Sequence, residues 1–385
     1  MKADFNLVKV DTTEGFKALE SEWNQLYEKA EKSTVFSSWD WMFTWWEIFH
    51  NEFSRELYIL CLYNNDELVG IAPFHTNKQY PKSYIQGKTL QFISTGSLKD
   101  EDVTSEYLDF ITLPSVEEEM VNAVSAYLEE NRKDWSFADF DYLLEDSLIT
   151  RCFSRKTKIS KRVLENGVRF SVSPDQEFTD YQAKMGKRWR KMLDKKMRIL
   201  ERDGNIRIVT TNSSELLEPT ISLFRDMHCA RLKKVVGYCA YDSDKFASFH
   251  QKIIERLSPQ KKAIIKILYL GDEPIASYYI FSDKGQWHYY QSGFKAEYGN
   301  KYSPLFLLIC KEIERSIEED TLFDFMYEPS VESYKRYQYA AESEPMVRLY
   351  WSNTSSRLFF FDCAKYLQEK AIYWKANALN FREKT

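Results

Sequence analysis

Two side chains in the second half of the sequence could take up or hold a proton. His228 lies about one helical turn before Arg231 in a helix predicted over residues 214–232. The ordinary pKa of histidine, about 6.5, suits a general base, although a lone helical histidine is more often a surface or core residue. Asp324, in a predicted strand, could orient an amine or act as its base. A counterpart in the first half, Asp141, favours a structural role instead, and both interpretations stay open.

Three hydroxyl-bearing residues lie close together in a strand predicted over residues 286–293. Successive side chains of a strand point to opposite faces. Tyr290 and Ser292 would therefore share one face, and Tyr289 would lie on the other. One of these hydroxyls could protonate a leaving group. Packing of half-buried strand tyrosines is the alternative.

Positive charge gathers in one predicted helix, over about residues 179–203. Five of its cations recur on one face, namely Lys184, Lys187, Arg188, Lys191 and Lys195. That face could bind phosphate groups, an anionic glycan or RNA, or could simply be solvated. Arg190, Lys196 and Arg198 add to the positive charge of the helix. Farther along the chain, Tyr334 and Lys335 follow the last predicted strand. The lysine there could hold a phosphate or a carboxylate, or could be solvated.

The elements that must position these residues occur in one order twice. In each half, helices precede a β-hairpin, a further strand, a long helix and a closing strand, as apolar periodicity and polar turns indicate. In the first half we expect helices over 13–29 and after Ser38, the hairpin over 57–62 and 68–74, and further strands over 90–93 and 106–112. The long helix follows over 115–131 and the closing strand over 136–143. In the second half we expect helices over 179–203, 214–232 and 243–257, the hairpin over 263–270 and 275–281, and a further strand over 286–293. The long helix follows over 304–318 and the closing strand over 322–327. The repeated order indicates an internal duplication.

Length and charge bound the class of protein. A chain of 385 residues is too long for one ordinary core and predicts two domains. We expect them over 1–165 and 166–350, followed by a helical extension over 351–385. The net charge of −5 argues against a dedicated DNA-binding protein. The sequence shows neither a membrane span nor a secretory leader, which favours a cytoplasmic location.

Cysteines and histidines give no sign of a metal site. The six cysteines lack CxxC spacing and are expected to be reduced thiols. They are Cys61, Cys152, Cys229, Cys239, Cys310 and Cys363. The five histidines form no HxxxH or HExxH pair, so we expect no metal.

Several motifs, in a fixed order along nearly the whole chain, resemble those of one family. In the first half they are Val35 to Trp41 followed by Trp45-Trp46, and Leu68 to Phe74. In the second half they are Lys187 to Lys191, His228-Cys229-Ala230-Arg231, Tyr289 to Phe294, Tyr302-Ser303-Pro304, Phe323-Asp324-Phe325 and Tyr334-Lys335. Together they resemble the GNAT-like acetyltransferases of the CelD type, which belong to bacterial polysaccharide biosynthesis and are related to the FemAB aminoacyltransferases.

The resemblance implies a fold and a reaction. The fold is α/β (α+β), with two tandem GNAT-like domains, each a mixed, largely antiparallel sheet flanked by helices. The reaction is N-acylation of an amine, such as an amino sugar or another small-molecule or glycan acceptor, by acyl-CoA (acetyl-CoA). The donor would lie in the second domain between two separating strands, with its diphosphate at the helix start after Ser303.

The resemblance also implies roles for single residues. The catalytic residues would be His228, Tyr290 and Asp324. The residues that contact the donor would be Ser292, Tyr302, Ser303 and Lys335. The residues that contact the acceptor would be Arg188, Lys191, Arg231, Tyr289 and Tyr334.

Two departures from the family pattern leave other functions open. Leu305 stands where the family has glycine after the Ser-Pro pair, and Tyr327-Glu328-Pro329 replaces glycine after the closing strand. Glycine would let backbone amides approach a diphosphate closely. A FemAB-like aminoacyltransferase that uses aminoacyl-tRNA is therefore a second possibility. A non-catalytic accessory protein of a polysaccharide pathway is a third.

Overall fold

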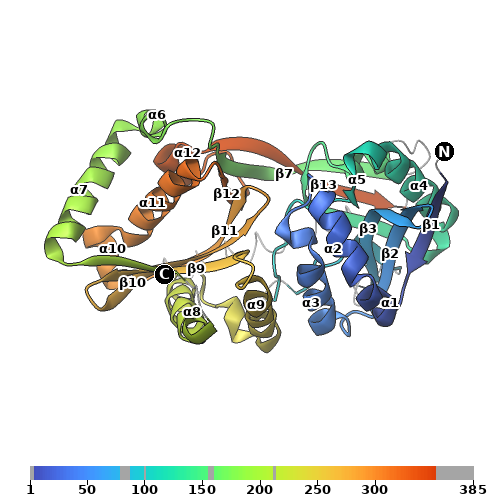
Figure 1. Cartoon of the computed structure of the whole chain (residues 1–385), viewed down its shortest axis with the longest axis horizontal. Coiled ribbons are helices and arrows are strands. Elements are labelled where there is room, and N and C mark those ends of the chain that lie inside the picture. Colours follow the sequence, from blue (N-terminus) through green and yellow to red (C-terminus); the bar gives the residue numbers. More distant parts are fainter. Residues whose placement is uncertain (1–3, 79–86, 99–100, 155–159, 211–213, 353–385) are drawn as a thin grey trace, which may run out of the picture.

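The computed structural model describes residues 4–78, 87–98, 101–154, 160–210 and 214–352. Within them the chain forms two lobes that lie side by side and share one continuous sheet (Figure 1). The first lobe consists of the elements from β1 to α5 together with β13. The second lobe consists of the elements from α6 to α12 together with β7.

The first lobe packs five helices on its part of the sheet. The strands are β1 (Phe5–Val10), β2 (Glu56–Asn64), β3 (Glu67–Asn77), β4 (Thr89–Phe92), β5 (Ile111–Thr112), β6 (Phe137–Leu144) and β13 (Glu342–Ser352). The helices in its described part are α1 (Thr13–Ala18), α2 (Glu20–Lys29), α3 (Trp39–Phe49), α4 (Glu117–Glu130) and α5 (Leu148–Ser154). α3 begins where predicted because the Ser38 hydroxyl accepts the amide N–H of Trp41.

The second lobe repeats this arrangement. Its strands are β7 (Ser160–Val172), β8 (Ile206–Thr210), β9 (Ala263–Leu270), β10 (Glu273–Asp283), β11 (Gln286–Phe294) and β12 (Leu322–Glu328). Its helices are α6 (Phe178–Lys184), α7 (Lys187–Asp203), α8 (Ser214–Val236), α9 (Asp244–Leu257), α10 (Ala296–Tyr302), α11 (Pro304–Glu318) and α12 (Tyr334–Tyr339).

The lobes exchange their last strands. The order across the described sheet is β1-β2-β3-β4-β6-β13-β7-β12-β11-β10-β9-β8, with β5 beside β3. β13, from the end of the chain, pairs with β6 of the first lobe, whereas β7 pairs with β12 of the second. β7 and β13 also pair with each other, and Figure 1 shows both running between the lobes. The expected boundary between residues 165 and 166 falls inside β7.

The two halves pair their strands in the same way. Each has an antiparallel series of four strands, a parallel pair, and an antiparallel final strand. The parallel pair is β4 with β6 in the first lobe and β11 with β12 in the second. This agreement supports the predicted internal duplication.

One hydrophobic core extends across the junction between the lobes. Trp41 of α3 packs edge-on against Phe249 of α9 and Phe281 of β10, with ring centroids 4.9 and 5.0 Å apart. Phe36, just before α3, lies 6.0 Å from Phe281. A second core lies beneath α11 on the opposite face of the second lobe. The lobes are therefore joined by buried aromatic contacts as well as by the sheet.

Some predicted elements differ in the structure. The strand predicted over 106–112 is reduced to β5, because Tyr107 adopts a left-handed φ of 60° that a strand cannot contain. The basic helix predicted over 179–203 is split into α6 and α7 at Met185 and Gly186. The strands β1, β7, β8 and β13 were not predicted. Nearly all of the extension predicted over 351–385 lies outside the described residues, and Trp351 and Ser352 belong to β13.

The prediction that all cysteines are free thiols is wrong for two of them. Cys229 of α8 and Cys239 form a disulfide whose Cα atoms are 5.2 Å apart. Fold geometry brings them together across ten positions of sequence, and no short motif marks such a pair. Cys61, Cys152 and Cys310 are free and buried, and Cys363 lies outside the described residues. Of the helices that the structure describes, none is long and apolar enough to cross a bilayer.

Candidate functional site

Two central strands of the second lobe separate from each other. β11 and β12 run parallel and pair from Gln286 and Leu322 to His288 and Asp324. Beyond this point β12 pairs with β7 on its other side, while β11 continues beside β10. A β-bulge at Tyr290 accompanies the separation, and such a bulge leaves the backbone of one residue outside the ladder. This is the pair of separating strands that the family resemblance implies.

A cavity of about 1050 Å³ lies between α8, the end of β11, and the starts of α11 and α12. Three cations line it, namely Arg231, Lys234 and Lys295, and so do the carboxylates of Asp226 and Glu297. Apolar groups make up much of the rest, including Met227, Phe294, Leu305, Phe306, Ile309 and Tyr339. A site with this mixture suits an elongated ligand that carries both anionic groups and an apolar arm.

The start of α11 faces this cavity. Ser303 is the N-cap in a left-handed conformation with φ of 51°, and Pro304 occupies the first helical position. The Ser303 side chain makes no capping hydrogen bond to the helix. The first amides of a helix have no partner within it and favour an anion. Ser303, Pro304 and Leu305 all line the cavity, so an anionic group placed there would meet the positive end of the α11 dipole.

Gly293 allows α8 to lie directly on β11. A Cβ atom at this position would lie 2.5 Å from the His228 amide nitrogen and 2.6 Å from the Met227 carbonyl carbon. Across this contact the Nδ1–H of His228 donates to the Ser292 carbonyl at 2.8 Å, and Arg231 Nη1 donates to the Ser292 hydroxyl at 3.2 Å. Burial lowers the pKa of His228. The structure thus brings His228, Arg231 and Ser292 together.

Tyr289 and Tyr290 lie on opposite faces of the sheet, as predicted. Tyr290 packs between His250 and Phe281, on the face covered by α8 and α9. Tyr289 packs against Phe325 on the other face. The prediction that Ser292 shares a face with Tyr290 assumed that side chains alternate regularly between the two faces of β11. The bulge at Tyr290 breaks this alternation, so the regular pattern does not apply across it.

Asp324 lies in a dense buried network where the strands separate. Its carboxylate accepts hydrogen bonds from His288 Nδ1 at 3.0 Å, Arg169 Nε at 3.2 Å and the Tyr107 hydroxyl at 3.2 Å. The amide of Met326 donates a fourth, at 2.7 Å. Burial alone would raise the pKa of Asp324, but Arg169 and His288 outweigh it and lower this pKa to about 2. A carboxylate held in this way is a weak base and favours the structural role.

The first lobe contributes to the same place. Glu106 Oε2 accepts the amide N–H of Tyr327 at 2.8 Å, just beyond the separation of β11 and β12. Glu106 is buried, and burial followed by the charge of Asp324 raises its pKa to about 8. Sequence reasoning missed Glu106 and Tyr107 because the segment 106–112 was interpreted as a strand. Two acidic residues, Glu106 and Asp109, stand in this otherwise largely apolar segment, and they are a signal that could have pointed to the site.

The remaining predicted residues divide into two groups. Tyr334 is exposed and lines the cavity. Lys335 is buried, and its ammonium group contacts the Phe325 carbonyl at 3.0 Å and the Glu328 carboxylate at 2.7 Å. The Tyr302 hydroxyl donates to Asp203 Oδ2 at 3.1 Å. Lys335 and Tyr302 therefore already have partners within the protein.

Arg188 and Lys191 are exposed on α7, the long helix at the edge of the second lobe in Figure 1. Neither lines the cavity, although Trp189 between them approaches Phe306 of the cavity wall, with ring centroids 6.0 Å apart. Lys196, on the same helix, donates to the carbonyls of Asn300 and Lys301. The basic face of α7 is thus adjacent to the start of α11 rather than inside the cavity.

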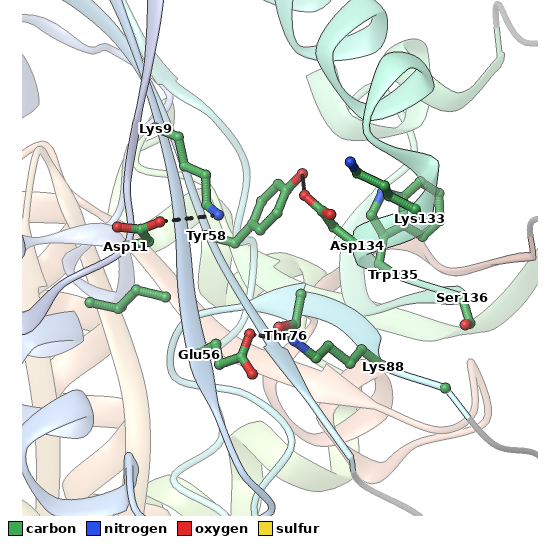
Figure 2. Close-up of a pocket in the computed structure, with 12 residues that line it drawn as sticks. Lys9, Asp11, Glu56, Tyr58, Thr76, Lys88, Lys133, Asp134, Trp135 and Ser136 are labelled. Carbon is green, nitrogen blue, oxygen red and sulfur yellow. Dashed lines mark hydrogen bonds and ion pairs between the residues drawn. The ribbon is translucent and has the colours of Figure 1, made fainter.

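A separate hollow of about 640 Å³ lies at the outer edge of the first lobe. Figure 2 shows that four of its charged side chains form pairs, Lys9 with Asp11 and Lys88 with Glu56, while the Tyr58 hydroxyl meets Asp134. Most of the charge in this hollow is therefore already paired within the protein. No group of three His, Cys, Asp or Glu side chains among the described residues could hold a metal ion.

Comparison with known proteins identifies the fold. Residues 187–336 match a family model described as "Acetyltransferase (GNAT) domain". The structure of FemX aligns with a TM-score of 0.59 and 10% identity, over 92% of this chain and 98% of that one. The C-terminal domain of a putative lysylphosphatidylglycerol synthetase from Agrobacterium fabrum aligns with a TM-score of 0.53 and 10% identity, over 91% and 96%. No curated protein sequence matches.

These likenesses confirm the predicted fold class. The chain consists of two tandem GNAT-like domains in a mixed α/β fold, each with a largely antiparallel sheet flanked by helices. The matched segment covers the second lobe from α7 to α12, which contains the separating strands and the cavity. The matched domain therefore indicates acyl transfer by a GNAT fold as the class of function to consider.

Proposed function

We propose that this chain is an N-acyltransferase that takes an acyl group from acyl-CoA in the second lobe. The observation that carries the proposal is the cavity at the start of α11, which adjoins the end of β11 beyond the separation from β12. The matched GNAT model over the same elements supports it. Acetyl-CoA is the donor that we propose to test first.

The cavity has groups that fit a coenzyme A thioester. Arg231, Lys234 and Lys295 offer positive charge, and the start of α11 offers free amides to a diphosphate. The apolar wall formed by Met227 and Phe294 would accompany an extended arm along β11. The backbone freed by the bulge at Tyr290 could hydrogen-bond that arm.

Acyl transfer needs few protein groups. A C–N bond forms at the thioester carbonyl, the C–S bond breaks, and a proton leaves the attacking amine for a base. Ser292, held by Arg231, lies on β11 between the bulge and the cavity and would supply a hydrogen bond near the sulfur. Tyr290 stays a candidate proton donor. Asp324 would fix the geometry of the branching strands rather than act as the base.

The acceptor that we propose is an amino sugar or a related amine of cell-surface polysaccharide synthesis. This part of the proposal comes from the family resemblance of the motifs in both halves. Tyr334, exposed at the cavity rim, and Arg231 are the predicted acceptor-contacting residues that lie at the cavity.

Calorimetric titration with acetyl-CoA tests the proposed donor. We expect micromolar affinity for the wild-type chain and at least tenfold weaker binding by Arg231→Ala, because a cation is removed from the cavity wall. Lys311→Ala is the matched control, since Lys311 is an exposed cation on α11 outside the cavity. Absence of binding at millimolar acetyl-CoA would reject the acyl-CoA proposal.

Aminoacyl-tRNA is the alternative donor, and the exposed basic face of α7 is the observation that favours it. A double variant, Arg188→Glu with Lys191→Glu, separates the two donors. If RNA is bound, filter binding of tRNA should fall at least tenfold in this variant while acetyl-CoA binding does not change. A chain that binds neither ligand would fit the third possibility, an accessory protein without catalytic activity.

A further inference from the structure

The first lobe has an opening of the same kind between its own central strands. β4 and β6 run parallel and pair at Thr89 with Phe137 and at Leu90 with Ala138, after which they separate. A cavity of about 140 Å³ lies at this opening. Gln91 from β4, Asp139 and Asp141 from β6, and Arg348 from β13 form part of its wall. The duplicated fold thus has a second strand opening, lined by polar groups.

The charges in this cavity leave one carboxylate unmatched. Arg348 donates to both carboxylate oxygens of Asp139 at 2.9 and 2.8 Å, and also forms an ion pair with Asp141 at 3.0 Å. Asp102 lines the same cavity, and within the described part of the chain it has no ion pair and no hydrogen bond. Burial, and then the charge of Asp141, raise the pKa of Asp102 to about 6. Asp102 is half-buried, and a carboxylate partly withdrawn from water beside a second carboxylate holds its proton more tightly.

A second polar group in the cavity wall also lacks a partner. The Ser97 hydroxyl is buried and makes no hydrogen bond in the described structure. A buried hydroxyl without a partner is costly and therefore uncommon in folded proteins. A ligand with hydrogen-bond donors would satisfy both groups.

The cavity adjoins both arms of the opening in the second lobe. Tyr142 in its wall packs edge-on against Tyr327 of β12, with ring centroids 4.7 Å apart. The negative charge of Asp102 also contributes to the raised pKa of Tyr290 on β11, after burial. Tyr290 and Tyr327 both lie just beyond the point where β11 and β12 separate. A group bound beside Asp102 would therefore be close to the place proposed for the acyl group.

We propose that the cavity of the first lobe binds the ammonium group of the amine acceptor, with Asp102 as its counter-ion. This inference rests on the proposed acyltransferase function, which it deepens by naming the acceptor site. The unmatched carboxylate selects a cation, and the absence of a metal-holding cluster among the described residues favours an organic one. Ser97 and Gln91 would hydrogen-bond hydroxyls next to the amine.

The same contact would prepare the amine for attack. An ammonium ion must lose one proton before its nitrogen can form the C–N bond, and the Asp102 carboxylate can accept that proton. The cavity volume admits only the amine-bearing end of an acceptor, because drug-sized ligands need about 300 Å³ or more. The rest of the acceptor would lie outside it.

Asp102→Asn tests the inference, because it removes the charge and keeps the shape. The probes are glucosamine and ethanolamine, each compared with its uncharged counterpart, glucose and ethylene glycol, by calorimetry. For the wild-type chain we expect each amine to bind at least tenfold tighter than its counterpart. In Asp102→Asn this preference should disappear while the affinity for acetyl-CoA stays unchanged. Asp272→Asn, in the exposed β9–β10 turn, is the control and should keep the preference.

The two proposals fail in different ways. If acetyl-CoA binds but neither amine is preferred over its counterpart, or the preference survives in Asp102→Asn, the acceptor site is wrong and the acyltransferase proposal stands. If the amines show the Asp102-dependent preference but acetyl-CoA does not bind, the cavity is a cation site and the proposed donor is wrong. Thermal melting shows whether Asp102→Asn is folded, and we expect it to melt no lower than the wild-type chain.

Discussion

Glu106 is a buried carboxyl group whose neighbours disfavour its charge. It accepts the Tyr327 amide, and burial and then Asp324 raise its pKa to about 8, against about 4.3 for an unperturbed glutamate. At neutral pH the folded chain therefore holds it mainly protonated. Its counterpart in the same network, Asp324, stays ionised because Arg169 and His288 hold it. Two carboxyls at the strand opening thus differ in protonation, because Arg169 forms an ion pair with Asp324 whereas the charge of Lys335 only partly offsets the burial of Glu106.

This difference predicts a pH-dependent stability. Because the pKa of Glu106 is higher in the folded than in the unfolded chain, its contribution is fully present below about pH 4 and is lost as pH rises towards 8. Glu106→Gln removes this dependence. We expect the variant to gain a few kcal/mol relative to the wild-type chain between pH 5 and pH 8, at about 1.4 kcal/mol per unit of pKa.

Urea unfolding at both pH values measures the effect. Glu14→Gln, at an exposed position of α1, is the control and should show no such gain. A difference between Glu106→Gln and the wild-type chain that is the same at pH 5 and pH 8 would contradict the raised pKa.

The sequence predicts individual site residues unevenly. Ser303, Arg231 and Tyr334 were singled out from motifs and do line the cavity of the second lobe. Lys335 was predicted to hold a ligand, yet its ammonium group contacts Glu328, a pairing that depends on how α12 folds back on β12. Glu106 was missed because its environment comes from the other lobe, and Asp102 because its neighbours Asp141 and Arg348 lie far from it in the sequence. Burial and charge that arise between distant segments leave no local pattern in the sequence.

At the scale of elements, the contact between α8 and β11 depends on one glycine. A side chain at position 293 would meet backbone atoms of Met227 and His228 at less than 3 Å, and a helix backbone cannot yield locally. Gly293→Ala should therefore destabilise the chain by about 1–3 kcal/mol, as overpacking does. It should also weaken acetyl-CoA binding, because Arg231 moves with α8.

Thermal unfolding checks this prediction against Gly186→Ala. Gly186 is the N-cap of α7, where an added Cβ would lie at an ordinary 3.6 Å from Trp189. A loss of a few tenths of a kcal/mol is expected there. Equal effects of the two substitutions would show that the close approach of α8 to β11 is not what Gly293 provides.

Periodicity predicts most elements of this fold but not how they join. The hairpins β2–β3 and β9–β10 and the helices α4 and α11 were predicted within a few residues, because each has a clear apolar face and polar turns. β7 and β13 were missed. Their side chains are mixed in polarity, and their partners lie more than a hundred residues away. Long-range strand pairing of this kind cannot be deduced from local alternation.

At the scale of the whole molecule, the exchanged strands make each lobe dependent on the other. β6 of the first lobe pairs with β13, which is at the end of the described chain. We expect residues 1–157, expressed alone, to be unable to fold, because they lack β13, whereas residues 158–385 keep β7 beside β12 and β13 and lose only β6, the other partner of β13. Expressed together, they should copurify and recover acetyl-CoA binding.

Size-exclusion chromatography and thermal melting test this dependence. The full-length chain is the reference, and it should unfold in one cooperative transition. A fragment 1–157 that melts cooperatively by itself, near the temperature of the whole chain, would show that the first lobe does not need β13.

The same exchange has a consequence in time. When β6 leaves the ribosome, at Leu144, its partner β13, which begins at Glu342, has not yet been synthesised. At roughly 5–20 residues per second, the missing stretch takes about 10–40 s to make. During that interval the edge of β6 is open, and an open strand edge can pair with other chains. Synthesis of this protein therefore includes an interval in which the first lobe is an unfinished sheet exposed to pairing with other chains.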